Sequence, residues 1–347
     1  LASPVLGSLS DKFGRRPILL LSLLGAGLDY LVMAFAPNLV VLFIGRLVSG
    51  LTGASFTVAT AYMADISDDS NRSANFGMIG AAFGLGFIVG PAIGGLIGHY
   101  GPTAPFIAAA VLNLANFAFG YFILPESLGV ELRRKIDWRK MNPFTSLTKI
   151  FTHKNISILI WVYTLLYLAG NSHPSIWALY TEMKFGWTPL QVGISLACVG
   201  IATALVQGGL VRVIIPKLGE AKSLFFGTAV YVIAFLAFAF ASEGWMVYVI
   251  LFPSALDGIA GPAIQSLITA EVPADAQGEL QGSLVSLGSL TSVIAPIVYT
   301  SVFAEFSKPE ASFRFLGMPY VLAAVIAAIA LYLSYLGVRA VNVSATK

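Results

Sequence analysis

The chain has 347 residues, of which 57% are hydrophobic and 11% are charged, with a mean hydropathy of +0.83 and a formal net charge of +3. One soluble core cannot bury this much apolar surface, so the composition excludes a soluble globular protein and indicates an integral membrane protein. No basic patch with interleaved aromatic residues is present, so nucleic acid is not an expected partner. The single Cys198 rules out an internal disulfide, and with three scattered histidines we expect no metal site.

Apolar stretches of about twenty residues follow one another along the chain, which favours membrane-spanning helices over a barrel. The chain opens on what reads as the end of a helix, Leu1 to Leu9, and a short charged turn, Gly7 to Pro17, leads into the first full stretch. Turns and charged clusters delimit ten stretches, at 18–35, 39–64, 74–98, 103–124, 156–181, 189–213, 223–241, 245–268, 280–304 and 318–338. We therefore predict an all-α membrane protein with ten complete helices and the stub of another.

The distribution of cations predicts which way the helices run. Lys12, Arg15 and Arg16 lie beside a span, and cations in that position are retained in the cytoplasm. If the loops alternate from there, sixteen of the twenty Lys and Arg residues fall in the cytoplasm and three fall outside, leaving Arg46 within a span. A bias this strong supports the number of spans.

Three separated motifs recur at nearly constant offsets of 205, 206 and 205 residues. They are Lys12-Phe13-Gly14 with Lys217-Leu218-Gly219, Ala64-Asp65-Ile66 with Ala270-Glu271-Val272, and Gly90-Pro91 with Ala295-Pro296. Such a repeat predicts two parallel halves, as in transporters built from duplicated bundles. We expect an N-terminal bundle at 1–124, a cytoplasmic linker at 125–154 and a C-terminal bundle at 155–347. The repeat also implies that about 50 residues are missing before Leu1, and hence a full architecture of twelve helices.

Three charged residues lie within the predicted spans: Asp29, Arg46 and Asp257. Each costs about 3 kcal/mol or more at the bilayer centre, so each needs a partner or a function. Asp29 and Arg46 fall roughly 10 and 12 Å below the outer face, so an antiparallel hairpin would bring them level. They form either an ion pair that only orients two helices or a titrating site. Asp257 lies between two prolines that bend its helix and is either a transport site or a structural acid.

Several polar or amphipathic residues also lie within the spans and are candidates for binding a bulky amphiphile. Amides in spans most often bridge neighbouring helices, but a cavity would use the same mixture of hydrogen-bonding groups and aromatic faces. The candidate substrate-binding residues are Asn113, Asn116, Asn171, His173, Trp177, Gln207, Tyr231 and Gln265. His173 is also compatible with a capping or packing role beside Pro174.

One predicted helix, 74–98, is unusually rich in glycine and carries a proline. This density predicts close helix packing, and Gly90-Pro91 predicts a bend. A nucleotide-binding glycine loop is excluded because no strand precedes the glycines and no Gly-Lys-Ser/Thr follows.

These motifs together resemble the major facilitator superfamily. Gly7-x-Leu9-x-Asp11-x-x-Gly14-Arg15-Arg16 is similar to its signature loop between helices 2 and 3, Gly45-Arg46-x-x-x-Gly50-x-x-Gly53 to its helix-4 motif, and Gly86-x-x-x-Gly90-Pro91-x-x-Gly94-Gly95 to its helix-5 antiporter motif. Further stretches resemble the TetA-type tetracycline efflux family. They include Gly25-Ala26-x-x-Asp29-Tyr30, Ala61-Tyr62-x-Ala64-Asp65-Ile66 and Leu124-Pro125-Glu126-Ser127.

The resemblance implies a fold of two six-helix bundles and export of a drug, tetracycline-like in the TetA-type family, in exchange for protons. Gly7, Asp11, Gly14, Arg15 and Arg16 would form a cytoplasmic gate, and Asp29 and Arg46 would belong to the proton-coupling and substrate pathway. Asp257 is not part of the resemblance, and we expect it to couple protons in place of a carboxylate that the family has and this chain lacks. Two positions depart from the family: its helix-9 aspartate falls at Tyr231 and its helix-8 histidine at Thr203.

We therefore expect a monomeric, multi-pass drug–proton antiporter of the bacterial inner membrane that is not an enzyme. No cofactor is expected, although the substrate could be a divalent-metal chelate. Its partners would be the drug, protons and membrane lipid. The alternatives are a proton-coupled uptake symporter for a small nutrient, which the helix-5 motif disfavours, and a membrane sensor that does not transport.

Overall fold

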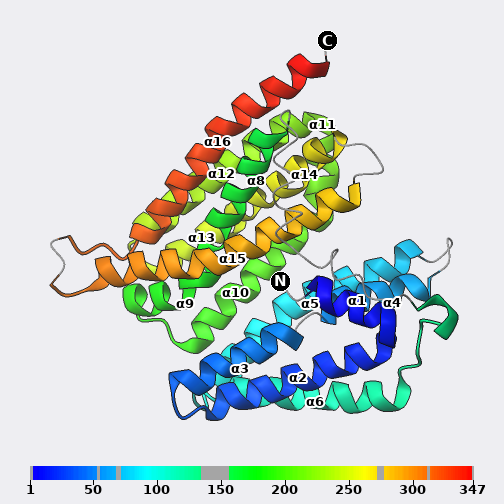
Figure 1. The fold of residues 1–347 in the computed structure, drawn as a ribbon. Coiled ribbons are helices and arrows are strands. Elements are labelled where there is room, and N and C mark those ends of the chain that lie inside the picture. Colours follow the sequence, from blue (N-terminus) through cyan, green and yellow to red (C-terminus); the bar gives the residue numbers. More distant parts are fainter. Residues whose placement is uncertain are drawn as a thin grey trace. The chain divides into compact units, whose positions relative to one another are not determined.

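The computed structural model describes residues 3–52, 55–67, 72–133, 156–271, 277–310 and 313–345, and every regular segment in these ranges is a helix. The chain divides into two compact units, Leu1–Pro143 and Phe144–Lys347 (Figure 1). The boundary between the units falls within the predicted linker, of which residues 125–133 are described.

Helix α2 is the centre of the first unit, where it contacts α1, α3, α4 and α6. The unit comprises α1 (Ser3–Phe13), α2 (Arg15–Phe35), α3 (Leu39–Thr52), α4 (Ser55–Asp65), α5 (Arg72–Gly98), α6 (Ala104–Ile123) and the 3-10 turn η1 (Val130–Leu132). A small apolar core joins α1, α2 and α4 at one end. It consists of Leu6, Ile18, Leu19, Val58 and Tyr62.

The second unit is built around α16, which contacts both α8 and α12 extensively. Its helices are α8 (Ser157–Gly170), α9 (Ser172–Phe185), α10 (Pro189–Leu205), α11 (Val211–Leu218), α12 (Glu220–Phe240), α13 (Gly244–Ser254), α14 (Ala260–Ala270), α15 (Gln277–Ser307) and α16 (Met318–Ala345). Two irregular segments interrupt this series: a π-helix, η3 (Val206–Leu210), and a 3-10 turn, η4 (Ala255–Ile259).

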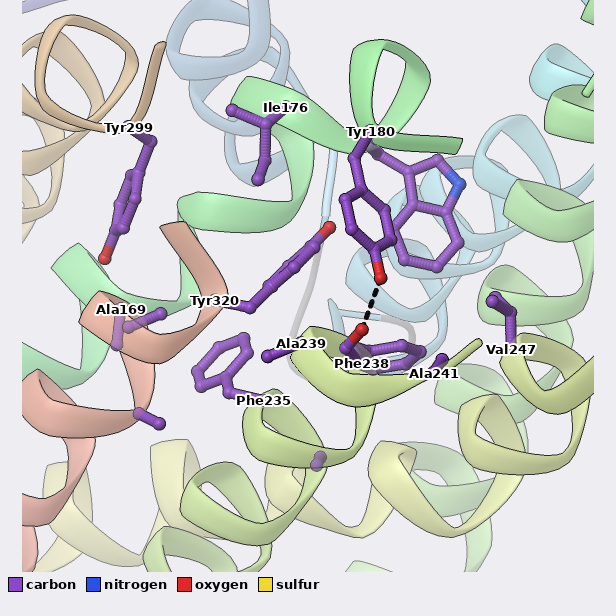
Figure 2. Close-up of a cluster of buried hydrophobic side chains, with 14 of the residues drawn as sticks. Ala169, Ile176, Tyr180, Phe235, Phe238, Ala239, Ala241, Val247, Tyr299 and Tyr320 are labelled. Atoms are coloured by element: carbon purple, nitrogen blue, oxygen red, sulfur yellow. Dashed lines mark hydrogen bonds between the residues drawn. The ribbon is translucent and has the colours of Figure 1, made fainter. Parts of the chain in front are cut away.

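Aromatic side chains fill one core of the second unit. Tyr180, Phe235, Phe238 and Tyr320 are fully buried there, and the Tyr180 hydroxyl donates to the carbonyl of Phe238 (Figure 2). This hydrogen bond satisfies a hydroxyl that would be costly to bury alone, and it ties α9 to the end of α12. A second, mostly aliphatic core joins α8, α12, α14, α15 and α16.

Each of the ten predicted spans contains helix, and within the described residues seven helices are long and apolar enough to cross a membrane. Two boundaries differ from the prediction. The span 156–181 is interrupted at Asn171 and continues to Phe185. The predicted charged turn, Gly7 to Pro17, is helical on both sides of the single residue Gly14.

Candidate functional site

The reversal between α1 and α2 depends on Gly14. Its φ of 106° is a conformation that residues with a side chain rarely adopt, and its N–H donates to the carbonyl of Ser10 at 3.0 Å. Because one residue makes the turn, the charged side chains on both sides of it remain on helices. Their positions are therefore fixed by helix geometry.

Arg15 joins three helices of the first unit. Its Nη1 donates to the Asp11 carboxylate at 2.5 Å and to the Ser10 hydroxyl at 2.7 Å, and its Nε donates to Asp65 at 3.0 Å. The Arg15 side chain is 10% exposed, so two carboxylates compensate a charge that is largely removed from solvent. Two of the expected gating residues, Asp11 and Arg15, are thus in contact, and α4 supplies a second acid.

Glu126, after the end of α6, caps the start of α2. Its Oε1 accepts the N–H of Arg15 at 2.8 Å and that of Leu128 at 3.1 Å, and its Oε2 accepts the N–H of Arg16 at 3.3 Å. The first N–H groups of a helix have no partner within the helix, and a carboxylate there also opposes the positive end of the helix dipole. Ser127 adds a hydrogen bond to Asp65 at 3.0 Å.

Arg16 behaves differently from Arg15. Its Nη2 donates to the carbonyl of Tyr121 at 2.6 Å and its guanidinium lies over the Tyr121 ring, away from Asp11. Of the predicted gating residues, Gly7 contributes its carbonyl to Ser10 at 2.7 Å. The sequence prediction had assigned no role to Asp65 and Glu126, although both lie in the motifs that carried the resemblance.

Asp29 of α2 and Arg46 of α3 form an ion pair, with 2.7 Å between Asp29 Oδ2 and Arg46 Nη1. The prediction that these residues lie level in a hairpin is confirmed. Asp29 is 5% exposed, and its second oxygen, Oδ1, has no hydrogen-bond partner among the described residues. Gly45 lets α3 approach, because a Cβ there would lie 2.6 Å from Val32 Cγ1 and 3.5 Å from Asp29 Oδ1. The pair thus holds one carboxylate oxygen in an ion pair and leaves the other unpartnered.

The remaining candidates of the first unit do not gather into a site among its described side chains. Asn113 donates to the carbonyl of Ala109 on its own helix at 2.9 Å, and Asn116 is exposed. In α5, a Cβ at Gly86, Gly90 or Gly94 would meet no described atom within 4 Å. The predicted close packing at these three glycines therefore stays a prediction, whereas helices approach closely at Gly45. Pro91 lies inside α5, and Gly95 is buried.

The second unit contains a cavity of about 470 Å³. One face of α8 contributes residues at helical spacing, and η3, η4, α12 and α14 supply the rest. The cavity is lined by Tyr163, Leu166, Tyr167, Gly170, Asn171, Gln207, Tyr231, Gly258, Gly261, Pro262, Ile264 and Gln265. Four predicted substrate residues, Asn171, Gln207, Tyr231 and Gln265, therefore share one cavity. Sequence reasoning missed Tyr163 and Tyr167, whose helical spacing from Asn171 was the available signal.

His173 and Trp177 were predicted to bind substrate but do not line this cavity. The His173 ring lies among Trp177, Phe235, Phe238 and Tyr320, and its Nδ1 is 3.3 Å from the Tyr320 hydroxyl. Trp177 donates from Nε1 to the hydroxyl of Ser195 at 2.9 Å. Trp177 belongs to the aromatic core of the second unit, and the His173 ring packs against that core.

Asp257 lies on η4, next to the cavity residue Gly258. The prolines 253 and 262 flank η4, as the predicted helix distortion required. Across the described ranges, no three His, Cys, Asp or Glu side chains gather as a metal site would require.

Comparisons with known proteins identify the family. The sequence profile of the Major Facilitator Superfamily matches residues 1–296. The chain is 42% identical over 304 residues to the class C tetracycline resistance protein of Escherichia coli, covering 88% of this chain and 76% of that protein. It is 40% identical over 303 residues to the class D protein of Salmonella ordonez, covering 87% and 76%. The crystal structure of the human organic anion transporter MFSD10 (TETRAN) superposes with a TM-score of 0.66 at 24% identity, covering 96% of this chain and 80% of that one. The chain is a multi-pass membrane transporter that belongs to the Major Facilitator Superfamily.

Proposed function

We propose that this protein exports a tetracycline-like drug from the bacterial cytoplasm across the inner membrane in exchange for protons. The observation that carries the proposal is the 42% identity with a tetracycline resistance protein over 88% of the chain. It acts as a monomer in which the two bundles alternate access to a central site, as in other transporters built from repeats.

The chemistry of the cavity in the second unit supports an amphiphilic substrate. Tyr163, Tyr167 and Tyr231 offer aromatic faces, and Asn171, Gln207 and Gln265 offer amide donors and acceptors. A drug with fused rings and a row of oxygens can stack on the former and hydrogen-bond to the latter. No cofactor is required, since a divalent metal would enter only as part of a drug chelate, which is cargo.

The Asp29–Arg46 pair supports proton coupling in the first unit. Ionised Asp29 attracts Arg46, and a proton on its unpartnered Oδ1 would remove that attraction. The charge change would loosen the contact between α2 and α3 without breaking the chain's packing elsewhere. Protonation of one oxygen can in this way favour one conformation of the bundle over another.

The proposal is tested with a pump-deficient bacterium that expresses the full-length protein. We expect resistance to tetracycline that a protonophore abolishes, and drug uptake by inverted vesicles when a proton gradient is imposed. Asp29→Asn should lower gradient-driven uptake about tenfold, because the amide keeps the shape but cannot cycle its charge. Glu305→Gln is the matched control, since Glu305 forms an exposed pair with Lys308 at 2.5 Å.

Two outcomes would overturn the proposal. Drug accumulation in whole cells instead of export would indicate the uptake symporter. If vesicles with Asp29→Asn take up drug as fast as wild-type vesicles, the Asp29–Arg46 pair only orients the two helices and does not couple protons.

A further inference from the structure

Asp257 is an acid inside a membrane span whose charge is not balanced by a neighbouring cation. It lies half-buried on η4, within the span Gly244–Ala270, and its carboxylate lies against the backbone N–H of Gly258. Among the described residues, no Lys, Arg or His side chain pairs with it. An unpaired carboxylate at this depth is costly when ionised, and taking up a proton removes that cost.

The packing of α12 against η4 places Tyr231 beside Asp257. Helix α12 runs antiparallel to α14, which continues η4. The Ser266 hydroxyl donates a hydrogen bond to Glu220 at one end, and Gly227 contacts Ala260 further along. A Cβ on Gly227 would lie 2.6 Å from the backbone nitrogen of Ala260, so the helices are in close contact there. Four residues along α12, at the α-helical rise, and three residues back through the 3-10 turn, which rises more per residue, both amount to roughly 6 Å. Tyr231 and Asp257 are therefore level, and the two groups interact electrostatically.

The two irregular segments of the second unit meet at this level. The π-helix η3 contacts the 3-10 turn η4, and each contributes a residue to the cavity, Gln207 and Gly258 respectively. A Cβ on Gly258 would lie 3.4 Å from the Gln207 amide nitrogen, so the amide lies close to the backbone of η4. π-Helical turns inside α-helices are frequent at functional sites. Asp257 thus directly precedes, in the sequence, a residue that lines the cavity.

Tyrosine hydroxyls line the cavity from this point outward along α8. The Tyr231 hydroxyl would lie 3.4 Å from a Cβ on Gly170, and Tyr231 and Tyr167 interact electrostatically. The centroid of the Tyr167 ring is 4.4 Å from that of the Tyr163 ring. Hydroxyl groups both donate and accept, so this series offers polar contacts between the carboxylate and a ligand in the cavity.

Other titratable groups on the packed helices are remote or absent. Helices α14 and η3 carry none, and Cys198 of α10 interacts with Tyr248 of α13. On α12, Glu220 and Lys222 lie roughly 14–17 Å along the helix from Tyr231. Tyr231 is therefore the titratable group that faces Asp257 within the described part of the chain.

We propose that Asp257 is the proton-binding carboxylate of the second bundle, and that Tyr231 is a positioning residue that keeps it beside the cavity. The inference rests on the proposed function. Asp257 binds a proton while the cavity is empty, and a cationic drug chelate in the cavity stabilises the anion and displaces that proton. By linkage, protonation of Asp257 weakens the binding of the chelate by the same factor.

Proton release on drug binding tests the proposal directly. Purified full-length protein in weakly buffered detergent is titrated with tetracycline and magnesium chloride, and a pH indicator counts the protons released. Asp257→Asn should release about one proton fewer per bound drug than the wild type, whereas Asp257→Glu should retain the release. Glu243→Gln, at an exposed site in the same bundle, is the matched control and should match the wild type.

Tyr231→Phe separates positioning from packing. Phenylalanine keeps the ring contact with Phe235, whose centroid is 5.5 Å away, but lacks the hydroxyl. Proton release should persist in this variant with a shifted pH midpoint. An unchanged midpoint would remove Tyr231 from the proposal.

A second measurement on the wild type does not depend on whether a variant folds. Dicyclohexylcarbodiimide modifies carboxyl groups that are protonated in apolar surroundings, and mass spectrometry locates the adduct. We expect an adduct on Asp257 at neutral pH that the tetracycline–magnesium chelate prevents. An unlabelled Asp257, or an Asp257→Asn protein that releases as many protons as the wild type, would overturn the inference and leave the proposed export intact. A wild type that neither binds nor transports the chelate would instead overturn the proposed function.

Discussion

Gly14 is constrained twice, by its backbone and by its neighbour. Its φ and ψ of 106° and 158° belong to a region that costs other residues about 1–3 kcal/mol. A Cβ would also lie 2.3 Å from Glu126 Oε2, the atom that caps the start of α2. Gly14→Ala should therefore destabilise the protein more than the backbone alone explains. The measurement is thermal denaturation in detergent, followed by size-exclusion chromatography.

Gly219 provides a matched control at the equivalent turn of the second half. Its φ and ψ are 79° and 159°, but a Cβ there would meet no described atom within 4 Å. Gly219→Ala should cost only the backbone term, so Gly14→Ala should exceed it by about 1 kcal/mol, the usual value of a helix cap. Adding Glu126→Ala to both variants should abolish that difference. Equal losses in the single variants would mean that Glu126 moves aside at no cost.

The sequence predicted the Asp29–Arg46 pair because both residues lie in one short hairpin, where rise per residue fixes their depth. It could not predict that Asp65 and Glu126 surround Arg15, because these partners are 50 and 111 residues away. It also could not predict that four aromatic rings surround His173, because the residue type does not reveal its neighbours. Local geometry can be read from a sequence, and long-range packing requires the fold.

At the scale of elements, the contact between α12 and the start of α14 depends on the absence of a side chain at Gly227. Alanine there would place its Cβ 2.6 Å from a backbone nitrogen and 2.9 Å from the Cβ of Ala260, so a helix must shift. We expect Gly227→Ala to destabilise the protein by about 1–3 kcal/mol, the usual cost of overpacking. Gly261→Ala is the control for stability, because a Cβ there meets no described atom within 4 Å. Its thermal midpoint should stay level or rise, since alanine favours helix.

Hydropathy located every span but not the irregular segments inside them. The length of an apolar run indicates how many residues cross the membrane. It does not indicate whether their backbone hydrogen bonds follow an α, 3-10 or π pattern. The distortion at η4 could be predicted because Pro253 and Pro262 remove backbone donors. The π-helix at Val206–Leu210 carries no proline, and its signal in the sequence is the pair Gly208-Gly209.

At the scale of the whole molecule, the two halves share a repeat but use it differently. In the first unit, Arg15 follows the turn glycine and binds two acids. In the second unit, the equivalent position is Glu220, which bonds to Ser266 of α14. The duplicated turn thus retains its backbone conformation while its charge is reversed. The network around Arg15 needs a cation at its centre. Glu220 places an anion at the equivalent position, so such a network cannot form there.

The alternation of loops predicts which residues face each side of the membrane. Lys217 and Lys222 flank the turn before α12 and should be cytoplasmic, whereas Glu243 and Lys308 follow α12 and α15 and should be outside. Because Cys198 is the single cysteine in the sequence, Cys198→Ala gives a cysteine-free background. In intact cells, a membrane-impermeant maleimide should label Glu243→Cys and Lys308→Cys. It should reach Lys217→Cys and Lys222→Cys only after the cells are permeabilised. The reverse pattern would mean that the protein has the opposite orientation in the membrane. Labelling of all four positions in intact cells would contradict the number of spans between them.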